Sequence, residues 1–253
     1  MIQKNTPKLW DNFWKPSSLE EDLFEIKKEE NSIRWRNIEK IILKKFKTFQ
    51  GLKIIEIGAG KGTNALLFAK RGAEVSVLDY SENALERSKI FFKRHKLKVN
   101  SILQDALNMD KKLQKNFDVS MSFGLAEHFT GEKRIKIIKT HFDVLKKEGI
   151  TFISVPNKFN PPYQINKTLF QLFGFWKVGE EHPFSPKELI NLSNSLGKKS
   201  FTFGGSFISS LNFVNPIKLI QKIFHLQLKI KKQRKTIFDN SFSYEIILVG
   251  QNN

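Results

Sequence analysis

The chain lacks cysteine, so disulfide bonds and thiolate metal sites are excluded. It also lacks a continuous apolar run of the roughly 20 residues that a bilayer-spanning helix needs. The N-terminal stretch MIQKNTPKLWDNFW has no apolar core of the kind found in signal peptides. We therefore expect a cytoplasmic protein without a transmembrane segment. Hydrophobic residues make up 40% of the chain and include 24 Phe, which is enough for a sizeable core.

Acidic residues are absent between Leu189 and Phe238, although the formal net charge of the whole chain is +18. The same span holds nine Lys and Arg residues. This pattern is typical either of a solvated lysine-rich surface or of a docking face for a polyanion. Residues 216–235 place apolar side chains at helical spacing between lysines, so peripheral membrane contact through them is one hypothesis. Nucleic acid is the other candidate polyanion.

Short apolar runs alternate with amphipathic segments from residue 52 onward. The runs are LKIIEIG, AEVSVLDY, NSILQDA, FDVSMSFG and GITFISVPN, and helix-like segments cover 63–72, 81–97 and 132–149. Ser81 is a predicted helix N-cap, and Gly72 and Gly149 are predicted C-caps. The alternation predicts an α/β fold, a Rossmann-like open twisted sheet with helices on both faces. Two later candidates, 199–207 and 243–251, bring the sheet to about seven mostly parallel strands.

The predicted organisation is a single domain, 1–253. A helical cap covers 1–48, with one helix over 17–48, and segments 157–183 and 206–238 are predicted substrate-lid insertions. The aromatic side chains of the cap and the first insertion are expected to cover an apolar acceptor. They are Trp10, Phe13, Trp14, Tyr163, Phe170, Phe173, Phe175 and Trp176. Ile217, Ile220 and Phe224 mark the apolar face of a helix predicted in the second insertion.

Three glycines, Gly58, Gly60 and Gly62, follow the first apolar run, which itself contains Glu56. Glycine at alternating positions typically lets the main chain approach a ligand closely. Ligands of open parallel sheets bind beyond the carboxyl ends of the strands. We expect free N–H groups of this loop, and the helix opening at Thr63, to face an anionic group. Glu56 needs a partner in its apolar strand, either a loop amide or the amino group of a ligand.

Asp79 ends the second apolar run, a position from which a carboxylate binds both hydroxyls of a ribose. Two nucleotide-binding motifs do not fit. A P-loop requires Ser or Thr after its lysine, but Lys61 is followed by Gly62. A dinucleotide fingerprint requires glycine three residues after Gly60, where Thr63 stands.

The pattern E-x-G-x-G-x-G, from Glu56 to Gly62, resembles the first motif of class I S-adenosylmethionine (SAM) dependent methyltransferases of the small-molecule type. Three later segments resemble that family in order and spacing. They are FDVSMSFGLAEHF, LKKEGITFISVPN and EHPFSPKEL. The resemblance covers roughly residues 50 to 195 and implies SAM as the cofactor. It also implies that the terminal strand, 243–251, runs antiparallel.

The resemblance implies roles for individual residues. The three loop glycines approach the methionyl part of SAM, Asp79 holds the ribose, Tyr80 packs on the adenine, and Asp105 contacts the adenine amino group. The complete predicted cofactor-binding set is Glu56, Gly58, Gly60, Gly62, Asp79, Tyr80, Asp105, Ala106 and Phe123.

Methyl transfer from a sulfonium is an in-line displacement, for which the protein mainly supplies alignment and exclusion of water. A base is needed only if the nucleophile loses a proton. His128 is the preferred candidate, followed by Glu127, His182 and Tyr163. Some quinone-type O-methyltransferases carry a further Glu three residues before this Glu-His pair and bind a divalent metal. That position is Gly124 here, so the sequence predicts no metal.

The predicted function is SAM-dependent methylation of a small molecule on oxygen, nitrogen or carbon. An RNA methyltransferase and a membrane-surface enzyme acting on a lipid or quinone-like acceptor are the alternatives that the charge raises. A binding protein without catalysis is a further alternative, which the intact glycine loop and its carboxylates disfavour. A dehydrogenase is another, which the spacing of the glycines disfavours.

Overall fold

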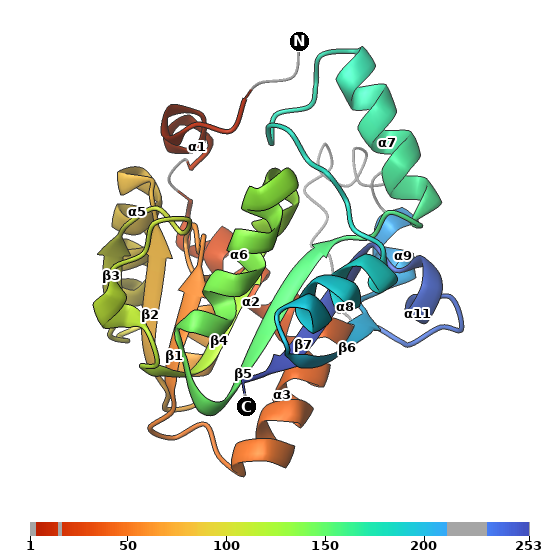
Figure 1. The fold of residues 1–253 in the computed structure, drawn as a ribbon. Coiled ribbons are helices and arrows are strands. Elements are labelled where there is room, and N and C mark those ends of the chain that lie inside the picture. Colours follow the sequence, from red (N-terminus) through yellow and green to blue (C-terminus); the bar gives the residue numbers. More distant parts are fainter. Residues whose placement is uncertain (1–3, 15–16, 212–231, 253) are drawn as a thin grey trace.

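A computed structural model describes residues 4–14, 17–211 and 232–252. Its centre is a seven-stranded sheet with the order β3-β2-β1-β4-β5-β7-β6 (Figure 1). The strands are β1 (Lys53–Ile57), β2 (Glu74–Asp79), β3 (Asn100–Leu103), β4 (Phe117–Phe123), β5 (Leu145–Pro156), β6 (Lys199–Gly204) and β7 (Glu245–Gln251). Each predicted apolar run therefore forms a strand.

The sheet is parallel from β3 through β5, and β7 runs antiparallel to both of its neighbours. This arrangement confirms the predicted fold class, including the direction of the terminal strand. Strand order reverses between β1 and β4, so the carboxyl ends of these two strands flank a crevice.

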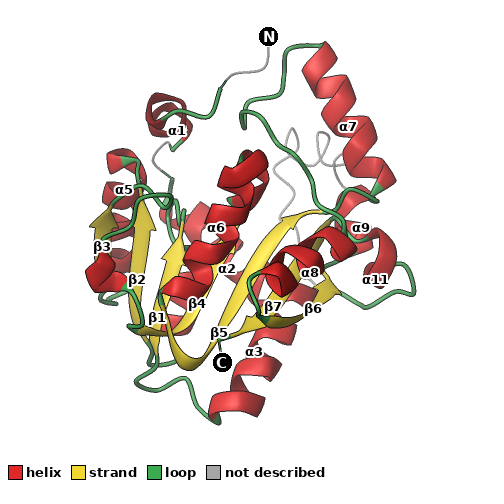
Figure 2. Ribbon diagram, viewed as in Figure 1, coloured by secondary structure: helices red, strands yellow, loops and turns green. Residues whose placement is uncertain are grey.

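Helices cover both faces of the sheet (Figure 2). They are α1 (Pro7–Phe13), α2 (Leu19–Glu30), α3 (Ile33–Phe46), α4 (Thr63–Ala69), α5 (Glu82–Arg94), α6 (Gly131–Asp143), α7 (Pro161–Leu172), α8 (Pro186–Ser195), α9 (Phe207–Leu211) and α11 (Asp239–Phe242), with 3-10 turns η1 (Lys111–Leu113) and η2 (Ala126–His128). Strand β1 shows how the two layers form. Ile54 packs with α2–α5 and Ile55 packs with α6 and α8.

The prediction of one helix over 17–48 is wrong, because the chain breaks at Asn31 and Ser32 between α2 and α3. The Ser32 side chain accepts the N–H of Trp35 at 2.9 Å and so starts a new helix. Gly149 is also not a helix C-cap. Helix α6 ends at Asp143, and Gly149 lies inside β5. Ser81 caps α5 as predicted, accepting the N–H of Ala84 at 3.1 Å.

A buried ionic cluster ties α2 to the glycine loop. Asp22, almost fully buried, lies 3.3 Å from the Lys61 ammonium and 2.9 Å from the Arg94 guanidinium. Burial alone raises the pKa of Asp22, but hydrogen bonds from Ser17 and Arg94 and the charge of Lys61 outweigh it and lower the pKa. Lys61 pairs with Glu25 as well. The cluster therefore fixes the helical cap against the loop.

We expect Asp22→Ala to lower the free energy of unfolding by about 3 kcal/mol, because Lys61 would lose its buried partner. Glu20→Ala, an exposed change in the first turn of the same helix, is the matched control and should cost less than about 0.5 kcal/mol. Urea unfolding followed by circular dichroism measures both. Equal midpoints for the two variants would show that the cluster contributes nothing.

Candidate active site

A cavity of about 390 Å³ opens at the carboxyl ends of β1, β2 and β4. Its size is within the range of small-molecule sites. Seven of the predicted site residues line it: Gly58, Asp79, Tyr80, Asp105, Ala106, Phe123 and His128. Three others, Glu56, Gly60 and Gly62, do not line it. The structure therefore brings seven of the ten predicted residues to one cavity, from segments that meet only in the folded chain.

The glycine loop differs from the expectation of free amides. The N–H groups of Gly58 and Ala59 donate to the carbonyl oxygen of Leu78 at 2.7 and 3.1 Å. The Gly60 N–H donates to the Asp79 carboxylate at 2.9 Å, and the Gly62 N–H donates to the carbonyl of Ala59 at 2.8 Å. Buried N–H donors require partners, and those of the glycine loop find them within the protein. The loop therefore contributes main-chain atoms of Gly58 and Ala59 to the cavity wall.

Two of the glycines serve packing. All three loop glycines have positive φ, and Gly62 has φ +74. A Cβ atom at Gly62 would lie 3.1 Å from the Val77 side chain, so this glycine lets α4 pack closely on the sheet. A Cβ atom at Gly60 would lie 2.1 Å from the Trp14 indole, which covers the loop there.

Asp79 lies at the end of β2 and is almost fully buried. Its two oxygens accept N–H groups from Gly60 and Ser81, at 2.9 and 3.0 Å. Burial raises the pKa of Asp79, and these N–H donors partly offset that increase. The carboxylate therefore joins the glycine loop to the start of α5 while it lines the cavity.

The buried Glu56 side chain binds the helix that follows the glycine loop. Its carboxylate accepts the N–H of Ala65, in the first turn of α4, at 2.7 Å. Burial raises the pKa of Glu56 to about 8. The sequence analysis expected an amide of the glycine loop or the amino group of a ligand as the partner, whereas the observed donor belongs to α4. Nearby, the Arg34 guanidinium lies 4.7 Å from the centre of the Phe123 ring and pairs with Glu29 at 2.6 Å.

Asp105 and Ala106 follow β3 and also line the cavity. The exposed Asp105 carboxylate accepts the N–H of Leu107 at 2.8 Å and the side-chain amide of Asn108 at 3.1 Å. This turn holds the buried Ala106 against the cavity.

Trp10 of α1 and Trp14, which directly follows this helix, line the cavity. Figure 1 shows α1 above α5 and the carboxyl ends of the neighbouring strands. The Ser81 hydroxyl donates to the Asp11 carboxylate at 2.6 Å, which ties this short helix to α5. The first insertion behaves differently from the prediction, since Phe173 and Phe175 are 63% and 66% exposed and do not line the cavity. The predicted apolar face at Ile217, Ile220 and Phe224 lies outside the described residues.

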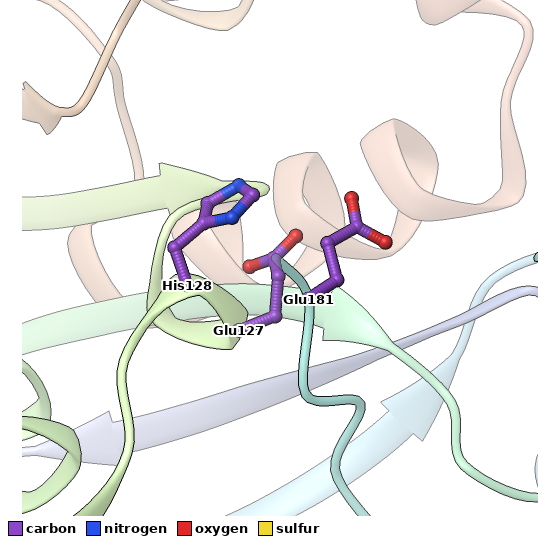
Figure 3. A group of neighbouring side chains, drawn as sticks. All are labelled: Glu127, His128 and Glu181. Atoms are coloured by element: carbon purple, nitrogen blue, oxygen red, sulfur yellow. The ribbon is translucent and has the colours of Figure 1, made fainter. Parts of the chain in front are cut away.

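Glu127, His128 and Glu181 lie side by side (Figure 3), and of these three His128 lines the cavity. The first two belong to η2 and the third to the segment between α7 and α8. The Nδ1 atom of His128 lies 2.7 Å from the carbonyl oxygen of Glu180. Since a carbonyl only accepts, Nδ1 donates, and the neutral ring keeps its lone pair on Nε2. Burial lowers the pKa of His128 and so favours that neutral form.

Glu127 was a secondary candidate from the sequence, and Glu181 was not a candidate at all. Burial, followed by repulsion from Glu181, raises the pKa of Glu127. The Tyr163 hydroxyl donates to the Glu181 carboxylate at 2.7 Å, so this tyrosine orients an acid. His182 is exposed and absent from the cavity lining. Glu181 lies in the EHPFSPKEL segment that resembles the family, and this was its only sequence signal.

Comparison with known proteins agrees with this geometry. Residues 54–149 match the family described as "Methyltransferase domain". The chain is 29% identical over 205 residues to the ubiquinone biosynthesis O-methyltransferase of Pelagibacter ubique, covering 76% of this chain and 82% of that protein. It is also 29% identical over 177 residues to the protein of the same name from Coxiella burnetii, covering 70% of this chain and 66% of that protein.

Among solved structures, the magnesium protoporphyrin IX methyltransferase of Synechocystis PCC 6803 superposes with a TM-score of 0.59. The sequences are 12% identical, and the match covers 97% of this chain and 93% of the other, so this likeness shows the fold. Within the described residues no helix combines the length and apolarity required to cross a membrane. The strand order, the methyltransferase-family match and the named relatives together indicate a class I SAM-dependent methyltransferase.

Proposed function

We propose that the enzyme transfers the methyl group of SAM to a hydroxyl oxygen of a small aromatic acceptor. The observation that carries this proposal is one cavity that Gly58, Asp79 and the neutral His128 all line. The names of the relatives, which are O-methyltransferases of ubiquinone biosynthesis, support oxygen as the methylated atom.

The cofactor roles are part of the proposal. Asp79 would bind the ribose hydroxyls, and Gly58, the loop glycine that lines the cavity, would bring the main chain close to the methionyl part. Glu56 would act indirectly, by holding the first turn of α4 through Ala65. The adenine would lie between β2 and β4, contacting Tyr80, Asp105, Ala106 and Phe123, which share the cavity.

His128 is the proposed catalytic residue. A hydroxyl is a poor nucleophile until its proton leaves, and a neutral imidazole favours that loss. The contact between Nδ1 and Glu180 fixes the ring, so that Nε2 is the basic atom. Trp10 packs edge-on against the ring at 5.0 Å between centroids, and with Trp14 it would exclude water from the reacting atoms.

The single-domain organisation with a cap and lids also remains a proposal. Helix α1 supports it, because it lies over the cavity that the sheet forms. The RNA and membrane alternatives depend on the basic stretch 189–238, of which 212–231 lies outside the described residues.

The test is transfer of a labelled methyl group from SAM to matched acceptors: a catechol, the corresponding aromatic amine and a ring-activated carbon acid. We expect the catechol to be methylated at least tenfold faster than the others, with the label on oxygen by mass spectrometry. Preferential labelling of nitrogen or carbon, or of added RNA, would overturn the proposal.

A further inference from the structure

The segment of residues 4–14 is held to two separate parts of the protein. The Ser81 hydroxyl, at the start of α5, donates to the Asp11 carboxylate at 2.6 Å. At the other end of the segment, the Asn5 side-chain amide donates to the Glu180 carbonyl at 3.0 Å. Glu180 lies in the connection between α7 and α8. The segment therefore links α5 to that connection.

The Glu180 carbonyl is the group that orients the His128 ring. Nδ1 of His128 donates to this oxygen at 2.7 Å, and the Asn5 amide donates to the same oxygen at 3.0 Å. A carbonyl oxygen has two lone pairs, so it accepts both donors at once. The Asn5 amide also lies 3.4 Å from the main-chain oxygen of His128. Asn5 and His128 are thus joined through one shared acceptor.

The Glu180 carbonyl lies in a stretch without regular secondary structure. Residues 175–183 form neither helix nor strand. Across the described part of the chain, no main-chain N–H donates to this carbonyl. Its direction is therefore not fixed by a helix or a sheet, which hold most carbonyls in a folded protein. The Asn5 side chain supplies a donor that the main chain does not.

Packing brings the same segment against both partners. A Cβ atom at Gly179 would lie 2.1 Å from Oδ1 of Asn5, so this glycine lets the amide approach the main chain next to Glu180. The Trp10 indole packs edge-on against the His128 imidazole, with 5.0 Å between the ring centroids. Asn5, Trp10 and His128 all line the cavity. The segment therefore constrains the histidine ring through an amide and through an indole.

Asn5 is expected to contribute little to the stability of the fold. Its Oδ1 atom is buried and accepts no hydrogen bond from the residues that the structure describes. A buried acceptor left without a donor costs about as much free energy as one hydrogen bond returns. Replacing Asn5 should therefore alter the site and leave the protein folded.

We propose that Asn5 is a positioning residue for methyl transfer, which holds the Glu180 carbonyl against Nδ1 of His128 and so directs Nε2 toward the acceptor hydroxyl. The inference rests on the proposed function, in which His128 is the base. Asn5 acts through the carbonyl and the ring. A misplacement of about 1 Å can cost a reaction about 100-fold in rate, so losing one of these constraints should cost about tenfold or more.

The test compares two changes at Asn5 with the same changes at Asn12, an exposed residue of α1. Asn5→Ala removes the donor, and Asn5→Asp replaces it with an acceptor of the same size. With a catechol acceptor we expect each to lower kcat about tenfold or more, while SAM affinity by calorimetry and the thermal melt stay unchanged. Asn12→Ala and Asn12→Asp should retain the rate of the unchanged protein.

A double-mutant cycle with His128→Asn distinguishes positioning from a general structural effect. If Asn5 acts through His128, adding Asn5→Ala to His128→Asn should lower kcat by less than about twofold further. A nitrocatechol gives a second readout, because its more acidic hydroxyl needs less help from a base. Asn5→Ala should therefore slow methylation of the nitrocatechol less than that of catechol.

Equal rates for the Asn5→Ala and Asn12→Ala variants overturn the inference. So does an undiminished further loss in the double variant, or an equal loss with both acceptors. The proposed function survives these results if His128→Asn still loses its rate and the label still enters oxygen. An unchanged rate in the His128→Asn variant, by contrast, overturns the proposed base and the inference with it.

Discussion

Asp79→Asn should weaken SAM binding more than tenfold, as measured by isothermal titration calorimetry. The carboxylate accepts N–H groups from Gly60 and Ser81, and Asp79 also lines the cavity. The amide of Asn keeps the size of the side chain and one acceptor oxygen but loses the charge. Hydrogen bonds to a charged acceptor are about twice as strong as neutral ones, and tenfold in affinity is about 1.4 kcal/mol.

The matched control is Asp143→Asn, which removes a carboxylate paired with Lys139 at the exposed end of α6. SAM affinity should change less than twofold in that variant. Unchanged affinity in the Asp79→Asn variant would show that no ribose lies against this carboxylate. A parallel thermal melt separates loss of binding from loss of the loop, because Asp79 also supports Gly60.

His128→Asn should reduce kcat by about 100-fold or more while SAM affinity stays within twofold. General acid–base assistance typically contributes at least this factor. His128 lines the cavity, and Asn at this position can still donate to the Glu180 carbonyl. Single-turnover kinetics with a catechol acceptor and calorimetry with SAM measure the two quantities.

His182→Asn is the control, because His182 contributes its main-chain N–H to Glu127 and its side chain is exposed. Its rate should remain near that of the unchanged protein. A small rate loss at His128, or an equal loss of SAM affinity, would mean that the ring serves cofactor binding or structure. Either result would contradict its proposed catalytic role.

The strands and most helices could be predicted because their signals are local. The run around Ile54 and Ile55 is apolar on both faces, and the structure divides these two side chains between the two layers. The ends of helices and strands were harder to predict where the spacing of apolar residues fits both a helix and a strand. Gly149 resembles a helix end in the sequence because the lysine-rich start of β5 continues the amphipathic spacing of α6.

The approach of Gly58 to Asp79 was also predictable, since the two residues lie at the ends of adjacent strands within one local motif. The acceptor side was not. Glu181 reaches Glu127 through a turn that follows α7, and sequence spacing gives no measure of that approach. The internal hydrogen bonds of the loop were missed for a similar reason. The Leu78 carbonyl that satisfies Gly58 belongs to the neighbouring strand.

The central claim is that the cavity between the glycine loop and Asp79 holds the nucleoside of SAM. The most direct test is a crystal structure of the protein with S-adenosylhomocysteine, the product of methyl transfer. We predict both ribose hydroxyls within hydrogen-bond distance of the Asp79 carboxylate and the sulfur directed toward His128. A nucleoside bound elsewhere, or a ribose with no contact to Asp79, would contradict the account.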